Sequence, residues 1–139
     1  GVLYIVSYQG NVMAIQADTG KLLLQHAMSS YRNMAFANDV LLVTDAKSHV
    51  WAMDAKRGQV IWTQPALEAR FVTAPAVNNG LVAVGDYQGY IHWLSLKDGH
   101  FVARDHLGGN GVKTQPLVSD DMWYAVTNSG EAYALKTKA

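Results

Sequence analysis

A repeat of about 40 residues constrains the fold of this chain more than any other feature of its sequence. Four copies are marked by a small residue within a polar stretch, at Gly10, Ser48, Gly89 and Gly130. The steps between these marks are 38, 41 and 41 residues. A further glycine follows each of the first three marks, at Gly20, Gly58 and Gly99. A period of this length is typical of solenoids and propellers, so the structure of the repeat unit decides the architecture.

Each mark lies between two short apolar runs, which in the third copy are Leu81–Val84 and Ile91–Leu94. The runs are too short for typical helices and are rich in β-branched and aromatic residues, which favours strands. They are nearly continuous rather than alternating, so both faces of each strand are expected to be buried. A propeller blade between two neighbours meets this condition, whereas ankyrin and tetratricopeptide repeats need amphipathic helices. The sequence therefore predicts an all-β fold, a β-propeller.

Each complete repeat is expected to supply a blade of four antiparallel strands. In the third copy these strands are expected at Val72–Val77, Leu81–Gly85, Tyr90–Ser95 and His100–Asp105. Pro75 and Pro116 are expected where the first strand of a blade begins, because proline donates no hydrogen bond to a sheet.

Residues 1–139 are predicted to form one partial propeller, with repeats at approximately 1–28, 31–64, 69–107 and 112–139. Strand counting gives three, four, four and three strands, about half of a seven- or eight-bladed ring. A closed ring of eight such repeats would need on the order of 320 residues. We therefore expect the C-terminal part of a longer protein. Its two ends would expose apolar faces or unpaired strand edges, so we also expect copies of the chain to associate.

Composition narrows the range of partners. The chain is 50% hydrophobic and 16% charged with a formal net charge of zero, which indicates an ordinary folded domain. Eleven basic and eleven acidic residues give no electrostatic footprint for nucleic acid or for a membrane surface. No apolar run approaches the length of a membrane-spanning helix. The lack of cysteine excludes disulfides and thiolate chemistry within this chain.

The sequence predicts no catalytic, cofactor-binding or metal-binding residues. The five histidines lack the i, i+4 spacing of a zinc site, and no Gly-x-Ser-x-Gly elbow is present. His92 and His100 are expected in strands, as packed or rim residues. Gly108–Gly111 lacks the Lys-Ser/Thr ending of a phosphate loop, so a flexible loop between blades is expected. Asp120 and Asp121 are expected in a solvent-exposed turn.

The aromatic residues fall into two groups. Five lie at strand positions where packing between blades needs bulk, and we expect them in the core: Trp51, Trp62, Trp93, Trp123 and Tyr133. Tyr8 and Tyr87 lie instead two residues before a mark, in hairpin tips, and each is followed by a glutamine. A tyrosine at such a tip is either propped against the next blade or exposed as a binding anchor. These two tyrosines are the candidate partner-contact residues.

Several segments resemble known families. Ala52–Trp62 resembles the PQQ-like repeat of quinoprotein-type propellers, in which Ala-x-Asp, a turn and a Trp recur. A narrower likeness involves Gly85–Trp93, Asp98–Ala103, Thr114–Pro116 and the end of the chain after Ala132–Leu135. These segments are similar to the last repeats of the BamB family, the propeller lipoproteins of the outer-membrane β-barrel assembly (BAM) machinery.

The BamB resemblance implies a non-enzymatic scaffold without a cofactor, part of an eight-bladed propeller. Members of that family are anchored to the periplasmic face of the outer membrane by a lipidated cysteine near their N-terminus. They bind the POTRA domains of BamA and help to insert β-barrel proteins; most of the residues known for that contact precede Gly1. The quinoprotein resemblance leaves an alternative open, a fragment of a dehydrogenase that holds pyrroloquinoline quinone and calcium on the propeller axis.

Overall fold

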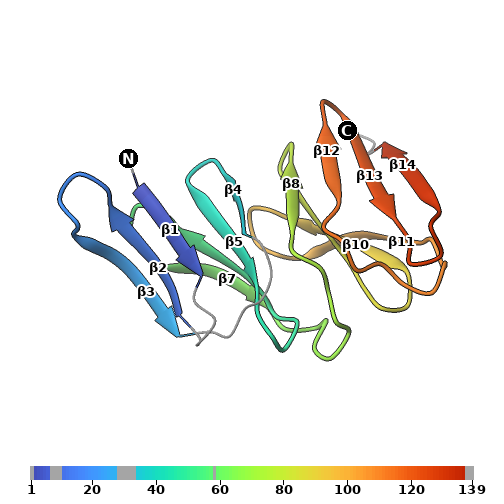
Figure 1. The fold of residues 1–139 in the computed structure, drawn as a ribbon, viewed down its shortest axis with the longest axis horizontal. Coiled ribbons are helices and arrows are strands. Elements are labelled where there is room, and N and C mark those ends of the chain that lie inside the picture. Colours follow the sequence, from blue (N-terminus) through green and yellow to red (C-terminus); the bar gives the residue numbers. More distant parts are fainter. Residues whose placement is uncertain (1, 7–10, 28–33, 58, 137–139) are drawn as a thin grey trace.

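The computed structural model of the chain describes residues 2–6, 11–27, 34–57 and 59–136. Within these ranges it contains strands and turns but no helix, and hence no helix that could cross a membrane. The strands form four antiparallel sheets of three, four, four and three strands. The sheets follow one another like the blades of a fan (Figure 1). The predicted all-β fold with four-stranded antiparallel blades is confirmed.

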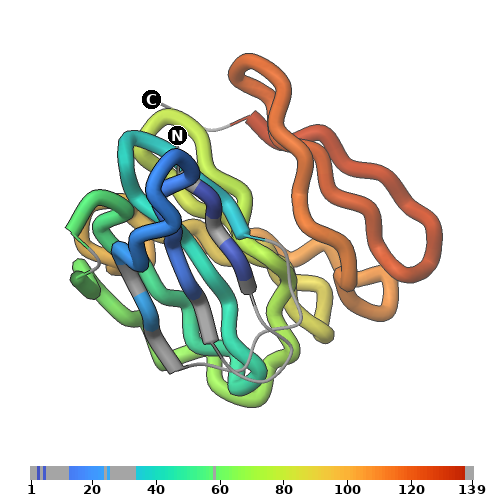
Figure 2. The backbone as a smooth tube through the Cα atoms, turned by 60° about the vertical axis from the view of Figure 1, so that its left-hand side comes forward, coloured from blue at the N-terminus to red at the C-terminus, as the bar shows by residue number. Residues whose placement is uncertain are grey.

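The four sheets, here called blades 1 to 4, follow the order of the sequence. Blade 1 contains β1 (Val2–Val6), β2 (Asn11–Gln16) and β3 (Leu22–Ala27). Blade 2 contains β4 (Ala35–Ala37), β5 (Val40–Thr44), β6 (Val50–Asp54) and β7 (Val60–Gln64). Blade 3 contains β8 (Ala76–Asn78), β9 (Leu81–Gly85), β10 (Tyr90–Ser95) and β11 (Phe101–His106). Blade 4 contains β12 (Leu117–Ser119), β13 (Met122–Val126) and β14 (Ala132–Lys136). In Figure 2 blades 1 to 3 lie one behind another, with blade 4 to one side.

Turn residues and prolines set where the strands of blade 3 begin. Asn79 and Gly80, which join β8 to β9, have φ angles of 49° and 78°, the pair of positive angles that a two-residue hairpin turn requires. Pro75 and Pro116 directly precede β8 and β12, as predicted. The first strand of blade 3 is shorter than expected and does not include residues 72–75, because Pro75 has no N–H to continue the ladder.

The start of the outer strand β11 was also predicted incorrectly. The strand begins at Phe101, not at His100. The His100 N–H donates to Asp98 Oδ1 at 3.0 Å, which holds His100 in the turn before the strand. His100 is accordingly exposed and does not belong to a strand.

Alternate residues of the inner strands pack against opposite neighbours, which explains the continuous apolar runs. In β9, Val82 and Val84 belong to the core shared with blade 2, whereas Ala83 belongs to the core shared with blade 4. In β10, Leu94 faces blade 2 and Trp93 faces blade 4 in the same way. Blade 3 is therefore held by two apolar interfaces rather than by a core of its own.

The aromatic residues predicted in the core divide into two classes. Trp62, Trp93 and Trp123 are buried, with exposed fractions of 8%, 4% and 1%. Trp93 and Trp123 pack edge to face across the interface of blades 3 and 4, with ring centroids 4.8 Å apart. Trp51 and Tyr133 are only partly buried. The core prediction is thus confirmed for the first three residues and holds in part for the other two.

Side chains of one blade also bond to the backbone of another blade. The indole N–H of Trp62 donates to the Leu96 carbonyl at 2.8 Å, and its ring lies on Gly99, where a Cβ would collide with it. Three amide side chains make further bonds of this kind, from Gln64 to the Gly99 carbonyl, from Asn78 to the Asp120 carbonyl and from Gln115 to the Pro75 carbonyl. These bonds join blade 3 to blade 2 and to blade 4.

The glycine-rich segment Gly108–Gly111 joins β11 to β12, so the prediction of a loop between blades is confirmed. This segment and the neighbouring Val112 are bonded to hairpins on both sides. The Asn128 N–H donates to the Gly111 carbonyl at 2.8 Å, and the Ser129 N–H donates to the Gly109 carbonyl at 2.9 Å. On the other side the Val112 N–H donates to the Asp86 carbonyl at 2.8 Å. These bonds give the loop a defined path, contrary to the expected flexible loop.

Candidate functional site

The hairpin between the two inner strands has the same internal bonding in blades 2, 3 and 4. An acceptor side chain, here called the tip acceptor, recurs every 41 residues at Asp45, Asp86 and Thr127. In blade 3, Asp86 Oδ1 accepts from the N–H groups of Gln88 at 2.9 Å and Tyr90 at 3.0 Å. The other two tip acceptors make one or both of the corresponding bonds. Local side-chain bonds of this type stabilise the tip independently of the sheet.

The tip acceptor of blade 3 also binds two side chains from farther away. Asp86 Oδ2 accepts from His92 Nε2 at 2.7 Å and from Arg70 Nε at 2.8 Å. Arg70 comes from the connection between β7 and β8, and its guanidinium also donates to Gln88 Oε1 at 2.8 Å. Because a carboxylate only accepts, His92 Nε2 carries the proton. Arg70, Asp86 and His92 are called the Asp86 cluster below.

The environment fixes the charges of this cluster. Burial opposes the ionisation of Asp86, but hydrogen bonds from His92, the Tyr90 N–H and Arg70 outweigh it and hold the pKa of Asp86 below its ordinary value. Burial also lowers the pKa of His92, against the opposing effect of the Asp86 carboxylate. Near neutral pH the cluster therefore holds an ionised Asp86 and a neutral His92, with Arg70 as the counter-ion.

The connection between β11 and β12 packs against the tip that carries Asp86. Gly89, at the end of the tip, has a φ of 86°, and a Cβ there would collide with the backbone of Gly108. The predicted left-handed conformation of Gly89 is thus confirmed. The equivalent residue of blade 2, Ser48, also has a positive φ, 68°, but it has room for its hydroxyl, which accepts from the Val72 N–H at 3.1 Å.

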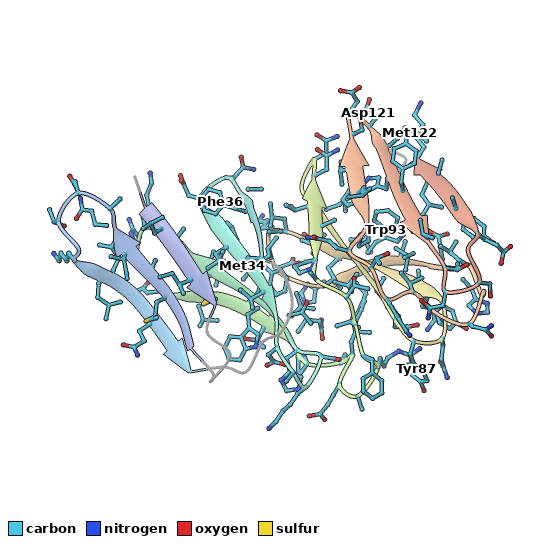
Figure 3. All side chains as sticks on the ribbon, viewed as in Figure 1. Met34, Phe36, Tyr87, Trp93, Asp121 and Met122 are labelled. Atoms are coloured by element: carbon cyan, nitrogen blue, oxygen red, sulfur yellow. The ribbon has the colours of Figure 1, made fainter. Side chains whose placement is uncertain are left out.

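The structure places the candidate contact residue Tyr87 on the surface, directly above this cluster. Its exposed fraction is 48%, and its ring meets Phe71, 66% exposed, edge to face with centroids 5.9 Å apart. The Arg70 guanidinium lies 5.9 Å from the Tyr87 ring centroid. Tyr87 lies at the edge of the molecule opposite the turn that contains Asp121 (Figure 3). Tyr8, the other candidate, lies outside the described residues.

Sequence reasoning missed Arg70 and Phe71, which complete this surface. Both lie in the connection before blade 3, where Ala69 and Phe71 adopt positive φ angles of 64° and 51°. Nothing in these residue types signals such a backbone. The role of His92 did have a signal, because His92 is 41 residues after Trp51, whose indole N–H donates to the tip acceptor Asp45 at 2.8 Å.

Within residues 2–6, 11–27, 34–57 and 59–136 no group of three or more His, Asp or Glu is placed to hold a metal ion. Asp120 and Asp121 are exposed in the β12–β13 turn, as predicted, and Asp121 Oδ1 accepts from Asn79 Nδ2 at 3.3 Å. His92 is buried, and its Nε2 donates to Asp86 Oδ2.

Comparison with known proteins decides the family. The family described as outer membrane protein assembly factor BamB matches the chain over residues 1–64 and 58–139. The chain belongs to the BamB family. Outer membrane protein assembly factor BamB of Legionella pneumophila (strain Paris) is 40% identical over 129 residues, which make up 93% of this chain and 33% of that protein. The chain thus spans about a third of the length of this curated BamB relative, and the predicted resemblance is confirmed.

Solved structures agree on the fold. The crystal structure of BamB from Moraxella catarrhalis matches with a TM-score of 0.89 and 24% identity, over 98% of this chain and 40% of that chain. A quinohemoprotein alcohol dehydrogenase from Pseudomonas putida HK5 matches with a TM-score of 0.72 and 19% identity, over 90% of this chain and 26% of that chain. At these identities both likenesses show the fold alone, which BamB shares with quinone-dependent dehydrogenases.

Proposed function

We propose that this chain is a non-enzymatic scaffold of outer-membrane protein assembly, with no cofactor. In this proposal it acts at the periplasmic face of the outer membrane, in a protein held there by a lipid anchor upstream of this segment. It binds the POTRA domains of BamA and assists the insertion of nascent β-barrel proteins. The observation that carries the proposal is the BamB family match over both halves of the chain.

Within this proposal Tyr87 contacts the protein partner, and Tyr8 has the same role in the first repeat. Support for Tyr87 comes from its half-exposed ring, its exposed neighbour Phe71 and the bonded tip beneath them. Tyrosine on a rigid support is favoured at binding surfaces because it presents a large ring at low entropy cost.

A pull-down of purified BamA POTRA domains by the natural-length protein tests this role. Tyr87→Ala is expected to weaken the interaction about tenfold, since an interface aromatic is worth about 1–2 kcal/mol or more. Phe36→Ala is the control, because it removes a ring that is 51% exposed at the opposite edge (Figure 3). Equal loss in both variants would contradict a specific contact at Tyr87, and no binding by the unaltered protein would contradict the BamA proposal itself.

The dehydrogenase alternative rests on the fold shared with the quinohemoprotein enzyme. Titration calorimetry with pyrroloquinoline quinone and with calcium separates the two readings. We expect no stoichiometric binding of either one. A micromolar site for both would favour the dehydrogenase.

We also propose that copies of this chain associate through their end blades. Blade 4 exposes Leu117, Tyr124 and Val126, and blade 1 exposes Leu3 and Ile5. Exposed apolar faces of this kind promote association. Light scattering after size exclusion, over a range of concentrations, should give masses above 15.2 kDa that rise with concentration. A 15.2 kDa monomer at every concentration would contradict the proposal.

A further inference from the structure

A hollow with a volume of about 320 Å³ opens at the Asp86 cluster, and Arg70 and His92 of that cluster are among the residues that line it. One wall is the connection between β7 and β8, which contributes Ala66, Leu67 and Arg70. The other wall is formed by β10 and β11, with His92 and Arg104 among its residues. The volume lies at the lower end of the range for small-molecule sites in proteins.

The charges around the hollow do not balance. Arg70 is paired with Asp86 at 2.8 Å, and the buried His92 is neutral near neutral pH. Arg104 forms no ion pair with any residue in the described part of the chain. Its guanidinium lies instead 4.8 Å from the Tyr90 ring centroid. The hollow therefore carries one excess positive charge.

Both guanidinium groups are held in position before any ligand arrives. Arg70 is fixed by Asp86 and by Gln88 Oε1. Arg104 rests on Tyr90, which stacks in turn on His106 with ring centroids 4.2 Å apart. Guanidinium donors suit planar carboxylates, and a pre-positioned donor loses less entropy when it binds.

The remaining lining is apolar. Leu67 is 3% exposed, and Phe101 is 44% exposed with its ring edge-on to His92, at 6.1 Å between centroids. Ala66 and Ala103 complete this part of the surface. An ion with no apolar body, such as phosphate, would leave these side chains without a contact.

We propose that this hollow binds a small carboxylic acid with an apolar body, whose carboxylate pairs with Arg104 and whose body packs on Leu67 and Phe101. At about 30 Å³ for each water-sized group, the volume suits a ligand of about ten heavy atoms. The site lies between the β7–β8 connection and blade 3, and all the residues that line it belong to this chain.

Ligand-observed saturation-transfer NMR on the natural-length protein tests the site, with 3-phenylpropionate as the probe. Its neutral analogue 3-phenylpropanamide tests the charge, and acetate tests the apolar body. We expect 3-phenylpropionate to bind about tenfold more tightly than either analogue, since each analogue lacks one of the two interactions. Equal binding of the acid and the amide would overturn the proposal, as would the absence of any signal for the acid at about 10 mM.

Two variants locate the site. Arg104→Gln should weaken binding of 3-phenylpropionate about tenfold and leave the amide unchanged, because it removes only the charge-assisted bond. Arg57→Gln is the matched control, an exposed arginine in the β6–β7 turn, and should leave both ligands unchanged. Equal loss in the two variants would mean that the acid responds to net charge rather than to this hollow, and would overturn the proposal.

Discussion

The hairpin tips of blades 2 and 3 share one backbone design and differ in what surrounds the tip acceptor. Asp45 accepts from two backbone N–H groups and from the neutral indole of Trp51, and it keeps some contact with solvent. Asp86 accepts from the same two backbone positions but is fully buried with Arg70 and His92. The repeat thus determines the backbone N–H groups that bind Oδ1 of the tip acceptor. The partners of Oδ2 differ between the blades, and in blade 3 they form a buried charge cluster.

Exchanging the residues at the end of each tip should give the largest difference between the blades. Gly89→Ser places a side chain against the Gly108 backbone at a positive φ and should lower the free energy of unfolding by about 4 kcal/mol. The reverse change, Ser48→Gly, removes only the acceptor of the Val72 N–H and should lower it by about 1 kcal/mol. Urea unfolding of both variants measures the difference. Similar losses would show that the Gly108 backbone can move aside.

Removing the charge of each tip acceptor should give the next largest effect. Asp86→Asn keeps an oxygen for the backbone N–H groups but leaves Arg70 without its counter-ion, and it should destabilise the fold by about 3 kcal/mol. Asp45→Asn also keeps an oxygen for the backbone N–H groups and loses the acceptor of the Trp51 indole N–H. It leaves no buried arginine without a counter-ion, so it should cost only about 1 kcal/mol. Thermal unfolding of the two variants at neutral pH tests this order. Equal losses would mean that the Asp86 cluster contributes no more than the shared tip.

A smaller effect is expected from acidification, which should lower stability through the Asp86 cluster of blade 3. The pKa of His92 is lowered in the folded state, so below its ordinary value of 6.5 the unfolded chain binds a proton that the folded chain does not, and stability falls as the pH falls. The pKa of Asp86 is also lowered, so its contribution is present above the ordinary value of 3.8 and is lost at lower pH. The free energy of unfolding should therefore fall as the pH is lowered from 7 to 5, mainly because of His92.

The variant His92→Gln should flatten this slope between pH 7 and pH 5, because glutamine can donate to Asp86 without titrating. The control is His100→Gln, in an exposed turn, and an equal flattening in this variant would contradict a specific role of His92. A slope that persists in His92→Gln would assign the acid sensitivity to another group.

The same contrast shows how far the sequence could lead. The 41-residue spacing, the apolar runs and the positions of Pro75 and Pro116 predicted the blades, because backbone hydrogen bonding and burial on both faces leave a repeated pattern in the residues. The conformation of Gly89 followed from the same repeat. The pairing of Arg70 with Asp86 did not, because it depends on the path of the connection at Ala69 and Phe71, whose positive φ angles no residue type there announces.

The bonds between blades have a consequence for how such a chain can change over time. The donors on Trp62, Gln64, Asn78 and Gln115 all reach main-chain carbonyls of the adjoining blade. Every residue has a main-chain carbonyl, whatever its side chain. The blade that supplies the acceptor can therefore change its sequence without losing the hydrogen bond. The donor side chains of a newly duplicated blade would likewise find main-chain carbonyls to bind on the adjacent blade. Hydrogen bonds of this kind allow duplicated blades to diverge in sequence. Each blade keeps its position in the sheet array while its surface residues acquire a different function.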